Sequence, residues 1–265
     1  MINMEDLSKY NPEGSTLRKA QLRMLEILIE VDKICRKHQI EYYLDAGSLL
    51  GAVRHGGFIP WDDDLDIVVP MKDFKRLSKA LMAELPDSMV YQDRFTDWNF
   101  PSVIAKVRDK NSYFYEEECT DRLKEKGIFI DIFPIEKVPS MWWKRKIDYP
   151  YGHCIRAIHN YTDKKDKFVS CLIFPFVWVL VQLTRIVNLF IPSDKIALCY
   201  GWRPTYNICN SKDIYPVKRM NFEGFQACVP NNPDAVLKAY YGDYMQIPPE
   251  EKRQVHSTII KFYDE

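Results

Sequence analysis

The stretch that decides the fold is residues 42–67, which read YYLDAGSLLGAVRHGGFIPWDDDLDI. It begins with a short apolar strand pattern that ends at Asp45, and a glycine-containing turn then leads into one or two helical turns at 49–53. Clustered aspartates follow, just before a second apolar strand pattern at 65–69. Four of the chain's ten glycines and four aspartates in five positions lie in this stretch. The pattern therefore predicts a polar site at the ends of two strands.

The turn at Gly47 and Ser48 is a candidate anion-binding element. Glycine lets backbone N–H groups approach phosphate oxygens closely, and the serine hydroxyl adds another donor. Arg54 and His55 follow within ten residues. The planar guanidinium of Arg54 suits either a phosphate or an ion pair with a nearby aspartate. His55 either donates to phosphate or caps the turn.

The aspartates predict a site for a divalent cation. In an extended strand alternate side chains share a face, so we expect Asp62, Asp64 and Asp66 to point the same way and Asp63 to face away. Two carboxylates about 5 Å apart repel by roughly 3 kcal/mol at an effective dielectric near 20, which a cation would offset. Oxygen ligands favour a hard ion, Mg²⁺ or alternatively Mn²⁺. The alternative is a solvated acidic turn.

Asp131 lies in a further strand pattern at 127–133, which we expect to be bounded by Gly127 and Pro134. A carboxylate embedded in apolar sequence is seldom buried without a partner. Either a lysine or arginine pairs with Asp131, or Asp131 joins the metal cluster. There it would hold a second ion or accept a proton from an attacking hydroxyl group.

The rest of the chain predicts an α+β fold, a mixed sheet flanked by helices. Helical spacing of apolar residues and short strand patterns mark five further elements, namely helices at 15–38 and 72–85 and strands at 89–92, 103–107 and 113–115. We divide the chain into three parts: a catalytic core (1–140), a helical, partly apolar insertion (141–219) and a C-terminal helical segment (220–265). We expect the C-terminal segment to pack on the core.

Residues 168–184 carry no formal charge. A bilayer span needs about 20 apolar residues, so a buried core helix, an interfacial membrane helix and a span are three alternatives. The sequence on both sides of 168–184 is polar, which argues against a span. Lys164, Lys165 and Lys167 suit an anionic membrane surface or a solvated loop. The membrane alternative predicts a peripheral contact through 168–191.

Composition excludes several other classes of protein. The 37 basic and 37 acidic residues cancel, so the chain lacks the positive charge of a non-specific nucleic-acid binder. Seven cysteines without a CxxC pair predict reduced thiols. The N-terminal residues show no secretory signal pattern. We expect a cytoplasmic protein, held at the inner face of the plasma membrane if 168–191 contacts lipid.

Taken together, residues 42–67 resemble the signature of the LicD family, which comprises phosphotransferases of cell-surface glycans related to fukutin and the fukutin-related protein. GIFIDIFP at 127–134 resembles the family's second block, and YGDYMQIPPEEKRQVH at 241–256 is similar to its C-terminal block. The insertion at 141–219 matches least, and acceptor preference is expected there. Ala46 departs from the family pattern, in which glycine is frequent at this position.

The resemblance implies a nucleotidyltransferase-like fold. It implies that Gly47 and Ser48 hold phosphate, that Asp64 and Asp66 hold magnesium, and that Asp131 is the third carboxylate. Asp62 would contact the metal directly or through water.

The resemblance also implies a CDP-alcohol donor such as CDP-choline. The acceptor would be a glycan, free or lipid-linked, of teichoic acid, lipopolysaccharide or capsule. Two alternatives remain: nucleotidyl transfer at the same residues, and a catalytically silent scaffold that binds glycan or nucleotide.

Overall fold

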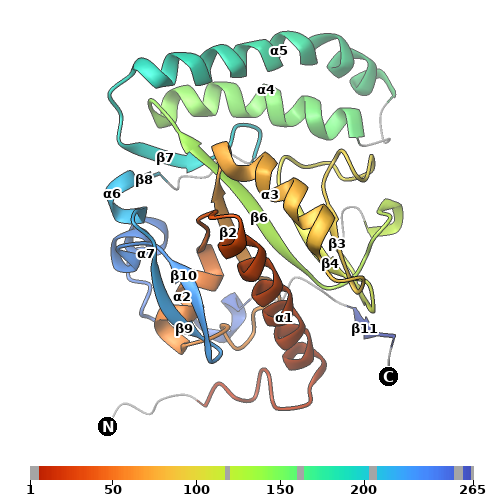
Figure 1. Cartoon of the computed structure of the whole chain (residues 1–265), viewed down its shortest axis with the longest axis vertical. Helices are drawn as coiled ribbons and strands as arrows, with labels where there is room; N and C mark the ends of the chain where they lie inside the picture. The colour runs from red at the N-terminus through yellow and green to blue at the C-terminus, as the bar shows by residue number, and fades with distance from the viewer. Residues whose placement is uncertain (1–5, 117–119, 160–163, 203–207, 254–258, 264–265) are drawn as a thin grey trace.

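The computed structural model describes residues 6–116, 120–159, 164–202, 208–253 and 259–263. Its centre is a mixed sheet built around the long strand β6 (Figure 1). The strand order is β1-β2-β6-β4-β3, with the bounds Tyr43–Leu44, Asp66–Pro70, Phe129–Lys137, Ala105–Asp109 and Met89–Gln92. β2 and β6 are parallel, and the other neighbours in this order are antiparallel.

Two helices cover one face of this sheet, α1 (Thr16–Lys37) and α3 (Met71–Glu84) (Figure 1). Both begin and end within one residue of the predicted helices. Ser15 caps α1, because its side chain accepts a hydrogen bond from the backbone N–H of Arg18. The apolar stripe of α1, which includes Met24 and Leu28, is fully buried in the main core.

The segments around β1 complete the core on the other side. α2 (Ala46–His55) contacts α7 (Pro233–Tyr241) and the hairpin of β9 and β10 (Lys218–Phe222 and Phe225–Val229). β5 (Ser112–Phe114) pairs with β11 (Ile260–Phe262), so the end of the chain returns to the core. The short helices are η1 (Thr120–Arg122), α6 (Ser211–Ile214) and η2 (Glu250–Lys252).

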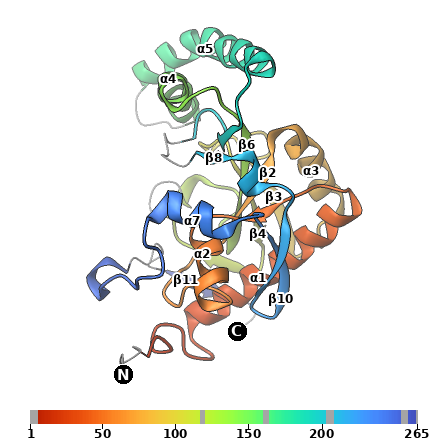
Figure 2. The ribbon, with the colours of Figure 1, turned by 90° about the vertical axis from the view of Figure 1, so that its left-hand side faces the viewer.

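A helical hairpin of α4 (Met141–His159) and α5 (Lys164–Phe190) caps one end of the molecule (Figure 2). The pair encloses a small apolar cluster of its own, which contains Ile147, Tyr151 and Val181. After the hairpin the chain returns to the sheet, where β7 (Lys195–Leu198) pairs with β6 and with β8 (Cys209–Asn210).

β6 differs from its predicted bounds, because it continues through Pro134 to Lys137. Proline cannot donate a ladder hydrogen bond. The last β4 partner of β6 is Ala105, which faces Ile132, so β4 has ended before Pro134. The carbonyl of Pro134 is still used, since it accepts from the Cys199 N–H at 2.8 Å. Apart from this extension, the predicted α+β class, a nucleotidyltransferase-like mixed sheet flanked by helices, is confirmed.

Ala46 begins α2 with a φ angle of 46°, in the left-handed region. A side chain there costs about 1–2 kcal/mol relative to glycine. This backbone angle gives a physical reason for the glycine that is frequent at this position in the resembling family.

We expect Ala46→Gly to raise the free energy of unfolding by up to about 1 kcal/mol, because relief of the positive φ outweighs the extra entropy of an unfolded glycine. Ala52→Gly, inside the same helix, should lower it by at least about 1 kcal/mol. Urea unfolding of both variants measures the difference. Equal losses in the two variants would contradict the interpretation.

Candidate active site

Three aspartates lie together at one edge of the sheet. Asp66 begins β2, and the parallel register places it beside Asp131 of β6. Asp45 follows β1, and its N–H donates to the Asp66 carbonyl at 3.1 Å. The backbone of three adjacent strands therefore brings together carboxylates that lie far apart in the sequence.

The glycine turn packs directly against the acidic residues. A Cβ atom added at Gly47 would lie 2.7 Å from Oδ2 of Asp62 and 4.0 Å from Oδ1 of Asp64. Ser48 is buried, and its hydroxyl oxygen accepts from the Asp66 N–H at 2.8 Å. Both residues belong to the first turn of α2, which starts three residues earlier than the sequence predicts. The structure thus places Gly47 and Ser48, two of the predicted phosphate-binding residues, beside the predicted metal-binding aspartates.

The aspartates strongly influence one another's protonation. The pKa of Asp66 is raised well above its usual value, first by burial and then by the negative charges of Asp64, Asp131, Asp45 and Asp62. Burial also raises the pKa of Asp45 to about 6, although hydrogen bonds from the Ala46 backbone and the Tyr240 hydroxyl oppose the rise. We call these five residues, Asp45, Asp62, Asp64, Asp66 and Asp131, the acidic cluster.

The stretch 62–65 precedes β2 and has no strand geometry. Strand alternation therefore does not govern these side chains. Asp63, which the sequence predicts to face away, is fully buried and lines the same cavity as Asp64.

Asp131 has a cationic partner, Lys106, whose identity the sequence did not determine. The ammonium of Lys106 lies 3.1 Å from Oδ1 of Asp131 and 2.8 Å from Oε1 of Glu116. Arg108 also pairs with Glu116, at 2.6 Å. Burial raises the pKa of Asp131 to about 6; Lys106 lowers it, whereas Glu116 and Asp64 raise it. The ion-pair alternative for Asp131 is therefore realised, with Lys106 as the partner, and Asp131 also lies near enough to Asp64 and Asp66 to affect their protonation.

Lys106, Arg108 and Glu116 were not predicted from the sequence. The available signal was the alternation of Lys106 and Arg108 with apolar residues, which puts two cations on one face of a strand pattern. Tyr240 and Tyr241, at the end of α7, were not predicted either. The pKa of Tyr241 is raised by burial and by four of the aspartates, among them Asp45 and Asp66.

Arg54 and His55 contact the C-terminal segment. The Arg54 guanidinium donates to the carbonyls of Tyr244 and Gln246 at 2.8 and 3.2 Å and to the His55 ring at 2.9 Å. Burial, together with Arg54, lowers the pKa of His55 to about 4. Within the described residues Arg54 makes no ion pair with an aspartate. Its present contacts tie α2 to residues 244–246.

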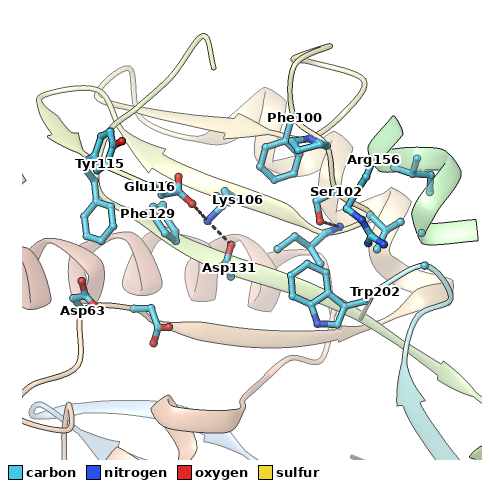
Figure 3. A pocket seen from close by; sticks show the side chains of 18 residues that line it. Asp63, Phe100, Ser102, Lys106, Tyr115, Glu116, Phe129, Asp131, Arg156 and Trp202 are labelled. Carbon is cyan, nitrogen blue, oxygen red and sulfur yellow. Dashed lines mark hydrogen bonds and ion pairs between the residues drawn. The ribbon is translucent and has the colours of Figure 1, made fainter. Parts of the chain in front are cut away.

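A cavity of about 400 Å³ opens beside Asp131 (Figure 3). Lys106 and its two acidic partners lie in its wall, joined by the ion pairs that Figure 3 marks. The helical hairpin supplies part of the opposite wall through Arg156 of α4. Aromatic rings also line the cavity: Phe100, Phe114, Tyr115, Phe129 and Trp202.

The acidic cluster is not a ready-made cage for an ion. Within the described ranges, no three His, Cys, Asp or Glu side chains are placed to ligate one metal as they stand. The donor set is nevertheless suitable for a hard cation, because it consists of carboxylate oxygens. Oδ1 of Asp45 is buried and has no hydrogen-bond partner among the described residues. A bound cation would offset this unsatisfied charge.

The raised pKa values predict how stability depends on pH. Asp45 has a folded pKa of about 6 against a usual value of 3.8, so the folded state binds more protons between these values. Stability should therefore fall as pH rises through this window. In metal-free buffer, Asp45→Asn should flatten the dependence and raise the free energy of unfolding at pH 7 by up to about 3 kcal/mol. Urea unfolding at a series of pH values measures the free energy of unfolding of each variant. Asp87→Asn, at an exposed position, is the control. An unchanged pH slope in Asp45→Asn would refute the raised pKa of Asp45.

Comparisons with known proteins identify the family of this chain. The family model described as "LicD/FKTN/FKRP, nucleotidyltransferase domain" matches residues 39–182, which contain all of the predicted site residues. The chain is 30% identical to the lipopolysaccharide cholinephosphotransferase LicD of Haemophilus influenzae over 263 residues, covering 91% of this chain and 96% of that protein.

Two further relatives match shorter parts. An uncharacterized protein of Rickettsia prowazekii, RP689, is 38% identical over 63% of this chain and 71% of its own length. The mouse ribitol 5-phosphate transferase FKRP is 53% identical over 80 residues, 30% of this chain and 16% of that protein. The family match spans more than half of the chain and the LicD alignment nearly all of it. The chain therefore belongs to the LicD/FKTN/FKRP family.

Proposed function

We propose that this protein transfers phosphocholine, or a similar phospho-alcohol, from a CDP-linked donor to a sugar hydroxyl of a cell-surface glycan. Its family and its alignment with LicD make it a transferase of phosphorus-containing groups. The observation that carries the proposal is the pairing of Asp66 with Asp131 on parallel strands, next to a cavity that can hold a small substrate. The LicD relative supports a phosphocholine donor and a lipopolysaccharide acceptor, and teichoic acid and capsule are other glycans of the same chemical class.

The acidic cluster would hold magnesium, or manganese in its place. Mg²⁺ typically binds through one or two carboxylates and completes its shell with substrate phosphates and water. Asp64 and Asp66 would supply the two carboxylates, and Asp62 would bind the cation directly or through water. The cation would neutralise charge on the donor diphosphate. This arrangement needs no third protein ligand in place before the donor binds.

Asp131 is the proposed proton acceptor. With a pKa of about 6, this carboxylate is mostly ionised at pH 7 and can accept a proton. Its pKa also lies close to the working pH, which favours efficient proton transfer. The acceptor hydroxyl would lose its proton to Asp131 while its oxygen forms a bond to phosphorus. The bond from that phosphorus to the CMP oxygen breaks, and CMP leaves. Lys106 orients the carboxylate, because it holds Oδ1 of Asp131.

Gly47 and Ser48 would position the donor. The absence of a side chain at Gly47 lets the Asp62 carboxylate pack against the turn, because an added Cβ atom would lie 2.7 Å from Oδ2 of Asp62. The Ser48 oxygen already accepts from the Asp66 N–H, so its own proton is available to a phosphate oxygen. At the opposite wall, the Arg156 guanidinium and the Trp202 ring offer a surface for phosphate and sugar groups.

Asp64→Asn and Asp66→Asn should each lower turnover about a thousandfold or more, because the charge that holds the cation is lost. CMP release from CDP-choline, with a glycan acceptor and Mg²⁺, measures this. Circular dichroism should show an intact fold, and EDTA should abolish the wild-type activity. Asp87→Asn, at an exposed position, is the control and should retain full activity.

Full activity in either site variant would overturn the assignment. Analysis of the glycan product separates the competing reaction, since nucleotidyl transfer would leave CMP on the acceptor and release no free CMP. Tight nucleotide binding without product would favour the silent scaffold.

A further inference from the structure

Helix α5 presents its polar side chains to the protein and its apolar ones to the outside. Asn188 is buried and donates to the Lys137 carbonyl at 3.1 Å. Arg185 pairs with Glu136 of β6 through contacts of 2.7 and 2.9 Å. A helix on the surface of a water-soluble protein normally shows the reverse pattern. The inverted arrangement indicates that the outward side of α5 contacts something other than water.

The outer face is large and continuous. We define it by eleven exposed apolar residues that follow helical spacing over the length of α5: Phe168, Val169, Leu172, Ile173, Phe176, Val179, Leu180, Leu183, Ile186, Val187 and Phe190. Phe176 is 76% exposed and Phe190 is 81% exposed. Contiguous exposed apolar surface of this kind marks an interaction site. Of the three alternatives for this segment, the buried core helix is therefore excluded, since only 22% of the most apolar stretch of α5 is buried.

The charges around this face point to lipid. Lys164 and Lys165 are exposed at the start of α5, and Lys167 follows one turn later. The acidic residue in α5 is Asp166, which pairs with His153 at 3.0 Å. Basic residues next to an apolar helix face attract anionic headgroups. A second copy that packed on this face with its α5 parallel would instead bring the lysines of the two helices together.

Helix α4 adds interfacial side chains to the same hairpin. Trp142, Lys146 and Tyr149 are exposed and spaced at four and three residues, so they share one side of the helix. The Lys146 ammonium lies 5.8 Å from the centre of the Trp142 ring. Aromatic rings with lysine are enriched where protein meets the headgroup layer.

The packing of the hairpin decides between lying on the bilayer and crossing it. By length and apolarity α5 could cross a membrane. However, α4 packs along α5 and carries charged residues throughout its length, including the buried pair of Lys144 and Asp148. A spanning α5 would draw these charges into hydrocarbon or lose its contacts with α4 and Glu136.

We propose that the outer face of α5 docks in the plane of an anionic bilayer, with the lysines at its start and the Trp142 side of α4 in the headgroup layer. α4 also lines the cavity beside Asp131 through Gly152, Ile155 and Arg156. Docking therefore places the cavity next to the membrane surface. Resting on the proposed function, this geometry suits a glycan acceptor that is carried on a lipid.

Flotation of the full chain with vesicles tests the docking without any assay of activity. The wild type should float with vesicles of phosphatidylcholine and phosphatidylglycerol, and less with phosphatidylcholine alone. The triple variant Leu172→Gln, Phe176→Gln, Leu183→Gln should bind about a hundredfold more weakly, because three apolar side chains lose their contact with lipid. Met82→Gln with Tyr263→Gln, which alters exposed apolar residues outside the hairpin, is the matched control and should float normally.

Several outcomes would overturn the proposal. The wild type could fail to float, or the triple variant could bind as well as the wild type. Light scattering could also show a wild-type dimer that the triple variant converts to a monomer without any change in flotation.

Tryptophan quenching by brominated lipids distinguishes docking from a span. Quenching should be stronger for shallow than for deep bromines. The opposite order, together with resistance to carbonate extraction, would show a span. CMP release from CDP-choline to a soluble acceptor should be the same in the triple variant and the wild type. Flotation without any CMP release would remove the proposed function and leave the docking standing.

Discussion

The whole site depends on one backbone constraint, the parallel register that sets Asp66 beside Asp131. Two carboxylates held this close repel each other. Burial raises the pKa of Asp66 most, and the charges of Asp64 and Asp131 raise it further. The protein offsets part of the repulsion with Lys106, which binds Asp131 from the antiparallel neighbour β4. We propose that the metal and the donor phosphates bind on the other side of the pair, nearest Asp64 and Gly47.

Residues close together in sequence were the predictable part. The stretch 42–67 specifies a strand, a helix with glycine at its start and a second strand, and local spacing was sufficient to locate the aspartates and both covering helices. Lys106 was unpredictable for a physical reason: its contact with Asp131 depends on which strands become neighbours, and periodicity does not encode strand order. Asp63 was misplaced because strand alternation was applied to 62–65, which lie outside β2.

Helix α5 shows a limit of hydrophobic patterns taken alone. The sequence reports that 168–184 is apolar, and apolar runs are usually buried. What the pattern cannot report is which side carries Thr184 and Asn188, because that depends on the position of Glu136 and Tyr200 in the folded core. Once those partners are known, the few polar residues of α5 reveal more about its surroundings than the many apolar ones.

Strand β6 connects both ends of this system. Asp131 lies near its start and Glu136, the partner of Arg185 in α5, lies near its end. Five residues of extended strand measure about 16 Å, and a central strand of a sheet does not stretch. A protein resting on a bilayer through its hairpin would thus carry its reactive carboxylate at a set height. On the proposed docking and function, β6 would therefore fix the distance between Asp131 and the bilayer. Acceptors would then be selected by how far their sugar stands from the lipid, as well as by the identity of the sugar.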